Sequence, residues 1–317
     1  MPIDIEALCY AIVETIKIFT PSIIIANALT LHDTKLKLKH LSKAEGNIIS
    51  MNVPSLKPPI EKKEQTIKTK EFIRPFVRKL VEYTNGENLD NLYRNIQSVK
   101  IKKKYDLIAA GSYNHKNNTI EYGPEKAFGH ELLHLSSSYY DEENEIGYSG
   151  FGQTHKKVSV GRGLNEGYTE LLASRIYNKK QKAESYKKEV QIARLFEFFF
   201  DNPKDMEKYY FNHDLPGFIH HMENFAPREE IIKILLQVDN IDTYDLVPLN
   251  PTPTINLIRT QIKLYDIFKE SNPEPEKLED FRNTIYKHSP MAGMLIDGKT
   301  FKLNHSMQKK STEKYSK

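Results

Sequence analysis

The residues with the clearest chemistry lie at positions 130–134, which read His-Glu-Leu-Leu-His. This is an H-E-x-x-H pattern. On a helix its two histidines, four positions apart, project from one face, so both imidazoles can bind one metal ion with Glu131 beside them. The only cysteine is Cys9, which excludes an intramolecular disulfide, a Cys-ligated structural zinc site and an iron–sulfur cluster. We therefore expect any metal to be held by His and carboxylates.

A third protein ligand is needed, because a catalytic zinc site takes three and leaves a fourth position for water. The metzincin extension of the motif would need Gly at position 137 and His at position 140, where the chain has Ser137 and Tyr140. That subclass is excluded. Acidic runs usually form solvated loops. One such run follows the motif, and each of its acidic members is a candidate ligand: Asp141, Glu142, Glu143 and Glu145.

A stronger source of the third ligand is the segment 163–170, which reads Gly-Leu-Asn-Glu-Gly-Tyr-Thr-Glu and is expected to open a second helix. Glu166 and Glu170 are again four positions apart. One carboxylate can ligate the metal while the other, one turn away, accepts a hydrogen bond from the distal nitrogen of a ligating His.

With these two patterns, H-E-x-x-H followed by N-E-x-x-x-E, the sequence resembles the gluzincin class of zinc metallopeptidases, the thermolysin-like grouping. The resemblance covers residues 105–178. It implies a zincin-like catalytic core, in which a small sheet with an edge strand lies beside an active-site helix and a Glu-bearing helix. The 32 residues from His134 to Glu166 are more than the best-known members have, so an inserted hairpin is expected there.

The resemblance also implies roles for individual residues and one Zn²⁺ per chain. His130, His134 and Glu166 are the implied zinc ligands. Glu131 is the implied catalytic carboxylate, which takes a proton from the attacking water and returns it to the leaving amine. Glu170 is the implied hydrogen-bond partner of a ligand His, and Asn165 lies beside the ligands.

The expected function is hydrolysis of peptide bonds in a peptide or protein substrate. The tetrahedral intermediate needs a hydrogen-bond donor for its oxyanion. The sequence does not choose among five candidates, Tyr148, His155, Tyr168, His220 and His221. If Thr119–Tyr122 is an edge strand, it could pair with an extended substrate, although an edge strand need not meet substrate at all. The alternative function is a noncatalytic, zinc-binding interaction protein with a zincin fold, which would keep the ligands but lack an oxyanion donor or an open cleft.

The elements around these residues predict an α+β, mostly helical fold. Helices are expected at 71–83, 89–98, 125–137 and 165–177, and short strands at 107–113 and 119–122 with a turn at 115–118. A glycine-punctuated hairpin is expected within 146–160. A helical C-terminal lobe begins near residue 180, with helical patterns at 183–200, 204–212, 215–224, 228–238, 254–271 and 277–288.

The chain ends differ from this metallopeptidase domain, which we place at 71–305. Residues 1–70 combine an amphipathic helix with a basic, proline-containing linker whose 33–70 part has nine Lys against four acids. The helix is expected to dock against the main domain, with binding to a membrane surface or a partner as the alternative. The linker reads as a solvated tether, with contact to an anionic surface as the alternative. Residues 306–317 read as a disordered tail. The net charge of +4 argues against a dedicated nucleic-acid binder. No secretory signal or transmembrane helix is readable, so we expect a cytoplasmic protein, with leaderless export left open.

Overall fold

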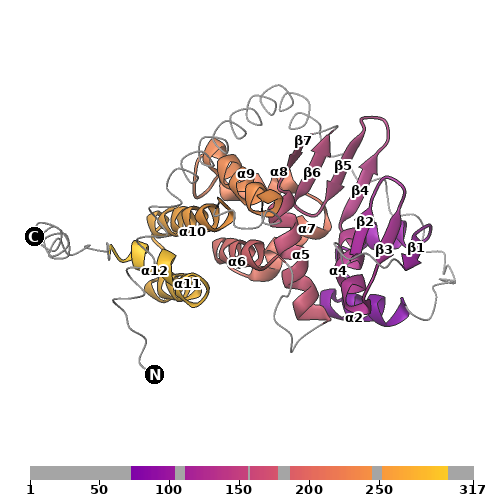
Figure 1. Cartoon of the computed structure of the whole chain (residues 1–317), viewed down its shortest axis with the longest axis horizontal. Helices are drawn as coiled ribbons and strands as arrows, with labels where there is room; N and C mark the ends of the chain where they lie inside the picture. The colour runs from indigo at the N-terminus through magenta and orange to yellow at the C-terminus, as the bar shows by residue number, and fades with distance from the viewer. Residues whose placement is uncertain (1–72, 104–110, 156–157, 178–185, 245–251, 299–317) are drawn as a thin grey trace, which may run out of the picture.

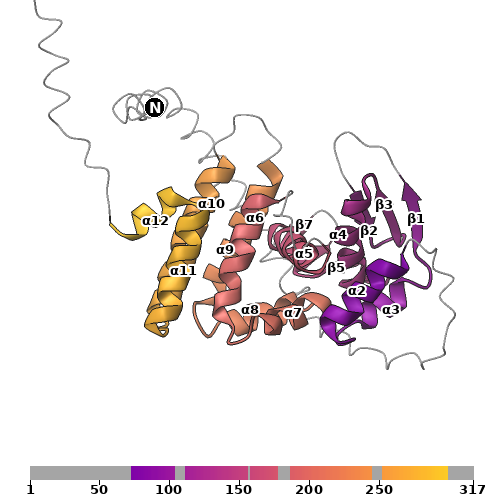
Figure 2. The same ribbon diagram turned by 90° about the horizontal axis from the view of Figure 1, so that it is seen from below.

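The computed structural model of the chain describes residues 73–103, 111–155, 158–177, 186–244 and 252–298. The protein is α+β and mostly helical, as the sequence predicts. Its described helices are α2 (Arg74–Thr84), α3 (Asp90–Asn95), α4 (Glu125–Ser136), α5 (Arg162–Ile176), α6 (Lys187–Phe196), the short 3₁₀ helix η1 (Glu197–Phe199), α7 (Pro203–Phe211), α8 (Leu215–Met222), α9 (Arg228–Tyr244), α10 (Thr252–Glu270), α11 (Pro275–His288) and α12 (Pro290–Ile296). The two sheets lie at one end of the molecule and α10–α12 at the other, with α5 and α6 between them (Figures 1 and 2).

The first sheet has the order β1-β3-β2, formed by β1 (Lys100–Lys103), β2 (Gly111–Asn114) and β3 (Thr119–Tyr122). Strand β3 is parallel to β1 and antiparallel to β2, so it is central, and the prediction that 119–122 is an edge strand is wrong. The prediction missed β1 because a strand rich in lysine has little intrinsic strand propensity. Among the described strands, β2 is the edge that packs beside α4, and the predicted turn joins it to β3.

The second sheet is an antiparallel meander of β4 (Ser138–Asp141), β5 (Ile146–Ser149), β6 (Gly152–His155) and β7 (Val158–Val160), in that order. It fills most of the connection between α4 and α5, where the sequence predicts an inserted hairpin. The insertion is larger than expected, because the residues just after α4 pair as β4. The acidic run closes the β4–β5 turn, where the Asp141 carboxylate accepts the backbone N–H groups of Glu143 and Asn144.

The C-terminal helices follow the predicted lobe, with some differences in their ends. Helix α9 continues to Tyr244, six residues past the predicted end, and α12 is an additional short helix. Aromatic rings fill the space between α6, η1, α10 and α11: Phe198, Phe199, Phe268 and Phe281. Most of the buried hydrophobic residues form one cluster, whose members run from Ile73 to Ala292 along the chain and include residues of the sheets and of the lobe.

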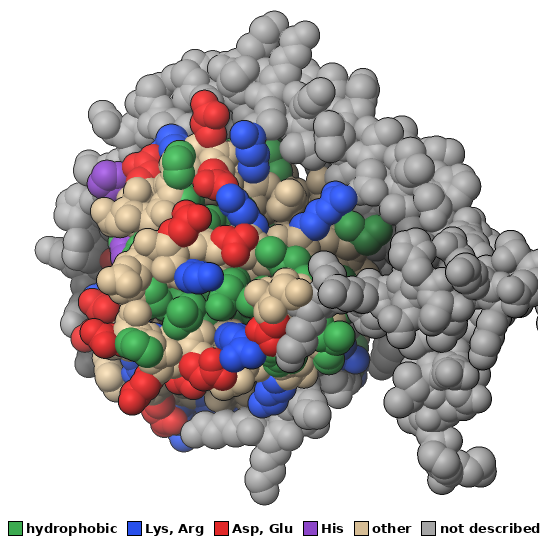
Figure 3. Space-filling view, turned by 90° about the vertical axis from the view of Figure 1, so that its left-hand side faces the viewer, with side chains coloured by type: hydrophobic (Ala, Val, Ile, Leu, Met, Phe, Trp, Pro, Cys, Tyr) green, Lys and Arg blue, Asp and Glu red, His purple; other side chains and the backbone are tan. Residues whose placement is uncertain are grey.

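The outer end of the lobe mixes charges of both signs. On the face shown in Figure 3, acidic and basic side chains alternate over the described surface and hydrophobic ones lie between them. Helix α12 carries two exposed large hydrophobic residues, Met291 and Leu295.

Several predictions concern segments outside the described residues. These are the N-terminal amphipathic helix and basic linker within residues 1–70, the tail at 306–317, and the first residues of the strand expected at 107–113. Within the described part of the chain, no helix combines the length and the apolar character needed to cross a bilayer.

Candidate metal centre

Helix α4 carries both histidines of the H-E-x-x-H motif. Pro124 precedes it in an extended conformation (φ −72°, ψ 144°), which suits the entry to a helix. Phe128, Leu132 and Leu135, spaced four and three residues apart, are buried in the core. Burial of this stripe turns the opposite face of α4, with the two imidazoles, toward α5.

Helix α5 presents the two glutamates of the second pattern. It begins at Arg162, earlier than predicted, because a side chain from α9 caps its N-terminus. The Asp239 carboxylate accepts the backbone N–H groups of Gly161 (3.0 Å) and Gly163 (2.8 Å). A carboxylate at this end of a helix satisfies donors that lack intrahelical partners and interacts favourably with the helix dipole. The cap fixes the turn of helix that carries Glu166.

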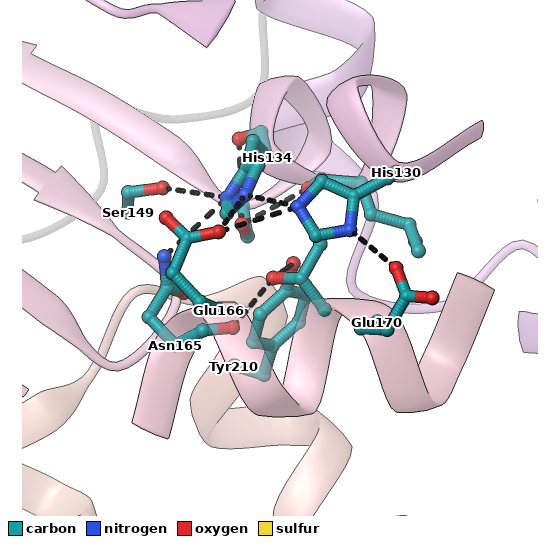
Figure 4. A network of polar contacts seen from close by, with 10 residues as sticks. His130, His134, Ser149, Asn165, Glu166, Glu170 and Tyr210 are labelled. Carbon is teal, nitrogen blue, oxygen red and sulfur yellow. Dashed lines mark hydrogen bonds and ion pairs between the residues drawn. The ribbon is translucent and has the colours of Figure 1, made fainter. Parts of the chain in front are cut away.

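Three side chains converge between the two helices (Figure 4). The Nε2 atoms of His130 and His134 are 3.0 Å apart, and the Oε2 atom of Glu166 lies 3.3 Å from the first and 3.2 Å from the second. Zinc bonds of about 2.0–2.1 Å would place tetrahedral ligands about 3.3 Å apart. The spacing and the donor atoms therefore fit a divalent ion such as zinc. Among the described residues, these three form the group of His, Cys, Asp or Glu able to hold a metal.

The distal nitrogen of each histidine faces a polar partner. His130 Nδ1 lies 3.0 Å from Glu170 Oε2, so an Nδ1–H donates to this carboxylate and leaves the Nε2 lone pair for a metal. His134 Nδ1 lies 3.3 Å from Asn165 Nδ2 and 3.4 Å from Ser149 Oγ. Partners of this kind fix the tautomer and the orientation of ligating imidazoles. Glu170 and Asn165 are thus the side chains that face the distal nitrogens of His130 and His134.

The Asn165 amide is compatible with a metal-binding tautomer of His134. Its Oδ1 is buried without a hydrogen-bond partner among the described residues, while its Nδ2 faces His134 Nδ1. Two donors would meet there if the ring carried its proton on Nδ1. Turning the amide by 180° lets Oδ1 accept from Nδ1–H, and it leaves Nε2 of His134 free to coordinate.

The buried charges at the centre shift one another's pKa. Burial disfavours the charged form of His130, but hydrogen bonds to Glu166 and Glu170 outweigh burial and raise its pKa to about 10. Burial likewise opposes ionisation of Glu166, yet His134 and His130 hold the pKa of its carboxyl well below the ordinary value. The centre therefore combines a carboxylate that stays ionised with imidazoles that attract a positive charge, either a proton or a metal ion.

Glu131 lies on the same helix but is not one of the three converging residues. Its carboxyl is buried, which raises its pKa, while the neighbouring His130 and His134 lower it in part. The side chain lies against the first residue of β2, since a Cβ on Gly111 would come within 2.8 Å of Glu131 Oε1. Glu131 thus lies between the metal centre and the edge strand, and its raised pKa suits a group that takes up and releases a proton.

Three of the five predicted oxyanion donors have their contacts elsewhere. Tyr168 is fully buried, with its ring against Phe151 at 5.3 Å. Tyr148 stacks over Tyr139 at 6.2 Å on the second sheet. His155 is the last residue of β6 and is half-buried.

The other two predicted donors lie on α8. The side chain of His220 is 84% exposed, and its ring pairs with Glu223. His221 donates to the Phe199 carbonyl at 2.9 Å, and its ring stacks on Phe200 at 4.1 Å. The side chains of four of the five candidates, all but His155, thus contact groups other than the candidate metal centre.

One neighbour of the centre escaped the sequence analysis. The ring of Tyr186, the residue before α6, stacks on His130 with centroids 5.6 Å apart and planes inclined by 15°. Tyr186 has a left-handed backbone conformation (φ 49°), which is uncommon for a bulky residue and is often found at functional sites. No motif marks this position, because the contact depends on how α6 packs against α5.

No protein-family model, curated protein or solved structure matches this chain. The interpretation of the centre therefore depends on its own geometry and chemistry.

Proposed function

We propose that the protein is a zinc-dependent metallopeptidase of the gluzincin type. The observation that supports the proposal most is the convergence of His130 Nε2, His134 Nε2 and Glu166 Oε2 at 3.0–3.3 Å from one another. The N-E-x-x-x-E helix adds support, because Glu170 contacts the distal nitrogen of His130. Burying charged groups costs free energy unless they are paired or bind a metal. A purely structural role for this group would need something other than a metal ion to offset that cost.

Glu131 is the proposed general base. A bound zinc ion supplies a water of lowered pKa and polarises the scissile carbonyl. As the water oxygen attacks the carbonyl carbon, Glu131 takes up the proton. It delivers that proton to the nitrogen as the carbon–nitrogen bond breaks, so that the amine leaves neutral. The raised pKa of the buried carboxyl favours this holding of the proton between the two steps.

The substrate is proposed to be an extended peptide that pairs with β2. This strand is an edge of its sheet among the described strands, and it lies beside α4. Its first residue, Gly111, touches Glu131. A peptide added along β2 would therefore pass the general base, with backbone hydrogen bonds giving affinity.

A noncatalytic zinc-binding protein is the second candidate function. One observation favours it: four of the five oxyanion donors expected from the sequence, all but His155, have side chains that contact other parts of the protein. Such a protein would keep the metal and bind peptides without cleaving them.

The Glu131→Gln variant separates the two functions. Purified wild-type protein should contain about one zinc per chain by elemental analysis and should cleave an unstructured protein such as denatured casein. Glu131→Gln should keep the zinc and lose cleavage by at least about 10³-fold, because the amide cannot accept the proton. Glu125→Gln, an exposed change in the first turn of the same helix, is the matched control. Wild-type protein with zinc but without cleavage would support the binder, and protein without zinc would contradict both functions.

A further inference from the structure

The β2–β3 turn places His115 against the second sheet. The His115 ring lies over Gly147 of β5 and is inclined by 33° to the ring of Tyr140, with centroids 5.6 Å apart. Gly147 and Tyr140 are direct cross-strand partners, so the imidazole covers one pair of residues in the β4–β5 ladder. The imidazole occupies the space of a Gly147 side chain, because a Cβ there would overlap with His115 Nε2.

Packing, not hydrogen bonding, holds this ring in place. Among the described residues, neither nitrogen of His115 has a hydrogen-bond partner. Burial lowers the pKa of His115, as do the nearby His134 and Lys116, which keeps the ring neutral. A neutral flat ring can pack on a glycine and beside a tyrosine at little electrostatic cost.

The strand that receives His115 also touches a proposed zinc ligand. Side chains two positions apart on a strand lie on the same face, so Gly147 and Ser149 share a face of β5. The Ser149 hydroxyl lies 3.4 Å from His134 Nδ1. The face that accepts His115 is thus the face that reaches the metal centre.

Both ends of β2 therefore contact residues next to the metal centre, one end directly and the other through β5. At its first residue, Gly111 contacts the Glu131 side chain. Directly after its last residue, Asn114, the His115 ring packs on β5. Within the described residues, the turn has one exposed lysine that also approaches Tyr140, with Lys116 Nζ 5.8 Å from the ring centroid.

We propose that His115 is a positioning residue for substrate binding: its packing on Gly147 holds β2 at a fixed distance from the metal centre. This inference rests on the proposed peptidase function and on β2 as the substrate strand. Loss of the ring should leave the zinc ligands and Glu131 in place, so the chemical step should change little. The substrate-pairing edge should become loose, so binding of substrate should weaken.

The test combines two single variants that disrupt the same contact from opposite sides. His115→Ala removes the ring, and Gly147→Ala adds the overlapping Cβ. Each should raise KM about tenfold, as expected for loss of one buried aromatic contact, and change kcat by less than about twofold. The double variant should be no worse than either single variant, because the contact can be lost only once. Zinc content should stay at the wild-type level, and Asn117→Ala, an exposed change in the same turn, should behave as wild type.

A third variant tests whether His115 acts by the packing of its ring or by the chemistry of its ring nitrogens. His115→Phe keeps a flat ring and should restore most of the wild-type KM. If it is as impaired as His115→Ala and the loss is in kcat, His115 acts through its nitrogens and the positioning role is overturned. Additive effects in the double variant would also overturn the proposal.

Hydrogen exchange of residues 111–122 provides a readout that needs no catalytic activity. Both single variants should speed amide exchange in this hairpin about tenfold relative to wild type, and the double variant should match them. If the single and double variants all speed amide exchange to the same extent but wild-type protein cleaves no substrate, the contact between His115 and Gly147 is supported and the peptidase function is contradicted. Unchanged exchange in both single variants would contradict the contact itself.

Discussion

The candidate metal centre and the C-terminal helical lobe are stabilised by different chemistry. At the centre, buried charged and polar groups hold one another, as in the 3.0 Å contact of His130 with Glu170. In the lobe, rings pack on rings: Phe281 lies 4.9 Å from both Phe198 and Phe268 between centroids, and it is fully buried.

This difference separates placement of ligands from stability of the fold. Buried charges are costly to desolvate and contribute little net stability, but their hydrogen bonds are directional and fix atoms in place. Apolar burial is favourable and weakly directional. Side chains of the lobe also reach the centre: Asp239 of α9 caps the helix that carries Glu166, and Tyr186 stacks on His130. The lobe therefore supplies stability, while α4 and α5 hold a buried group of charges whose desolvation is costly.

The largest effect is expected from removal of the shared carboxylate. Glu166→Ala leaves two imidazoles to hold the ion, so zinc affinity should fall by about 10³-fold or more. Competition titration with a chelating dye measures the affinity. Tight zinc binding by this variant would remove Glu166 from the ligand set.

The lobe should show the opposite pattern. Phe281→Ala should lower the free energy of unfolding by about 3–5 kcal/mol, because it leaves a cavity among buried rings. Zinc affinity of the folded variant should stay within about twofold of wild type. Urea unfolding of the metal-free protein and the same dye titration measure the two quantities. A large loss of zinc affinity in the folded variant would show that the two regions are not separable in this way.

The local part of the centre follows from the sequence, whereas the part that depends on contacts between distant segments does not. Two histidines four residues apart on one helix need no tertiary information to share a face, and α4 begins at Glu125 as predicted and ends one residue early. The N-E-x-x-x-E pattern adds Glu166 and Glu170, whose spacing is also local. The structure brings these residues together as expected.

What escaped prediction depends on contacts between distant segments. Asp239 caps α5 by binding residues that precede it by 76 and 78 positions, so no local pattern in the sequence marks this cap. Strand β1 has three lysines in four residues, so only pairing with β3 makes it a strand, and this pairing makes β3 central. Tyr186 reaches His130, and His115 reaches the second sheet, only through the packing of a helix and a turn on other elements.

A smaller effect on zinc affinity should follow from a change at Glu170, which contacts a proposed ligand of the metal but not the metal itself. Glu170→Gln keeps the size of the side chain but replaces the carboxylate that faces His130 Nδ1 with a neutral amide. Zinc affinity should fall about 10–100-fold, because the ligand imidazole becomes less basic and less firmly oriented. Glu125→Gln, on the exposed first turn of α4, is the control. Equal zinc affinities for Glu170→Gln and wild type would show that Glu170 does not contribute to zinc binding.

The smallest effect concerns a second buried histidine, which contrasts with His130. His213 is buried, and the Asn91 amide donates to its Nδ1 at 2.9 Å, which requires a neutral ring. Burial, with the Arg94 charge adding to it, lowers the pKa of His213 to about 4. The unfolded chain, where the pKa of a histidine is about 6.5, therefore binds more protons between about pH 6.5 and 4. The stability that His213 contributes is complete above this range and is lost as the pH falls through it.

His213→Asn tests this contrast, since asparagine tolerates the left-handed backbone of this position (φ 46°). From pH 7 to pH 5 the metal-free wild-type protein should lose about 2 kcal/mol more of its unfolding free energy than the variant does. Urea unfolding at the two pH values measures the difference, and His220→Asn, at an exposed ring, should follow wild type. Equal losses for His213→Asn and wild type would mean that the buried ring accepts a proton within the fold. His213, which is held by an amide, and His130, which is held by carboxylates, would then both take up a proton in the folded protein. The contrast between the two sites would fail.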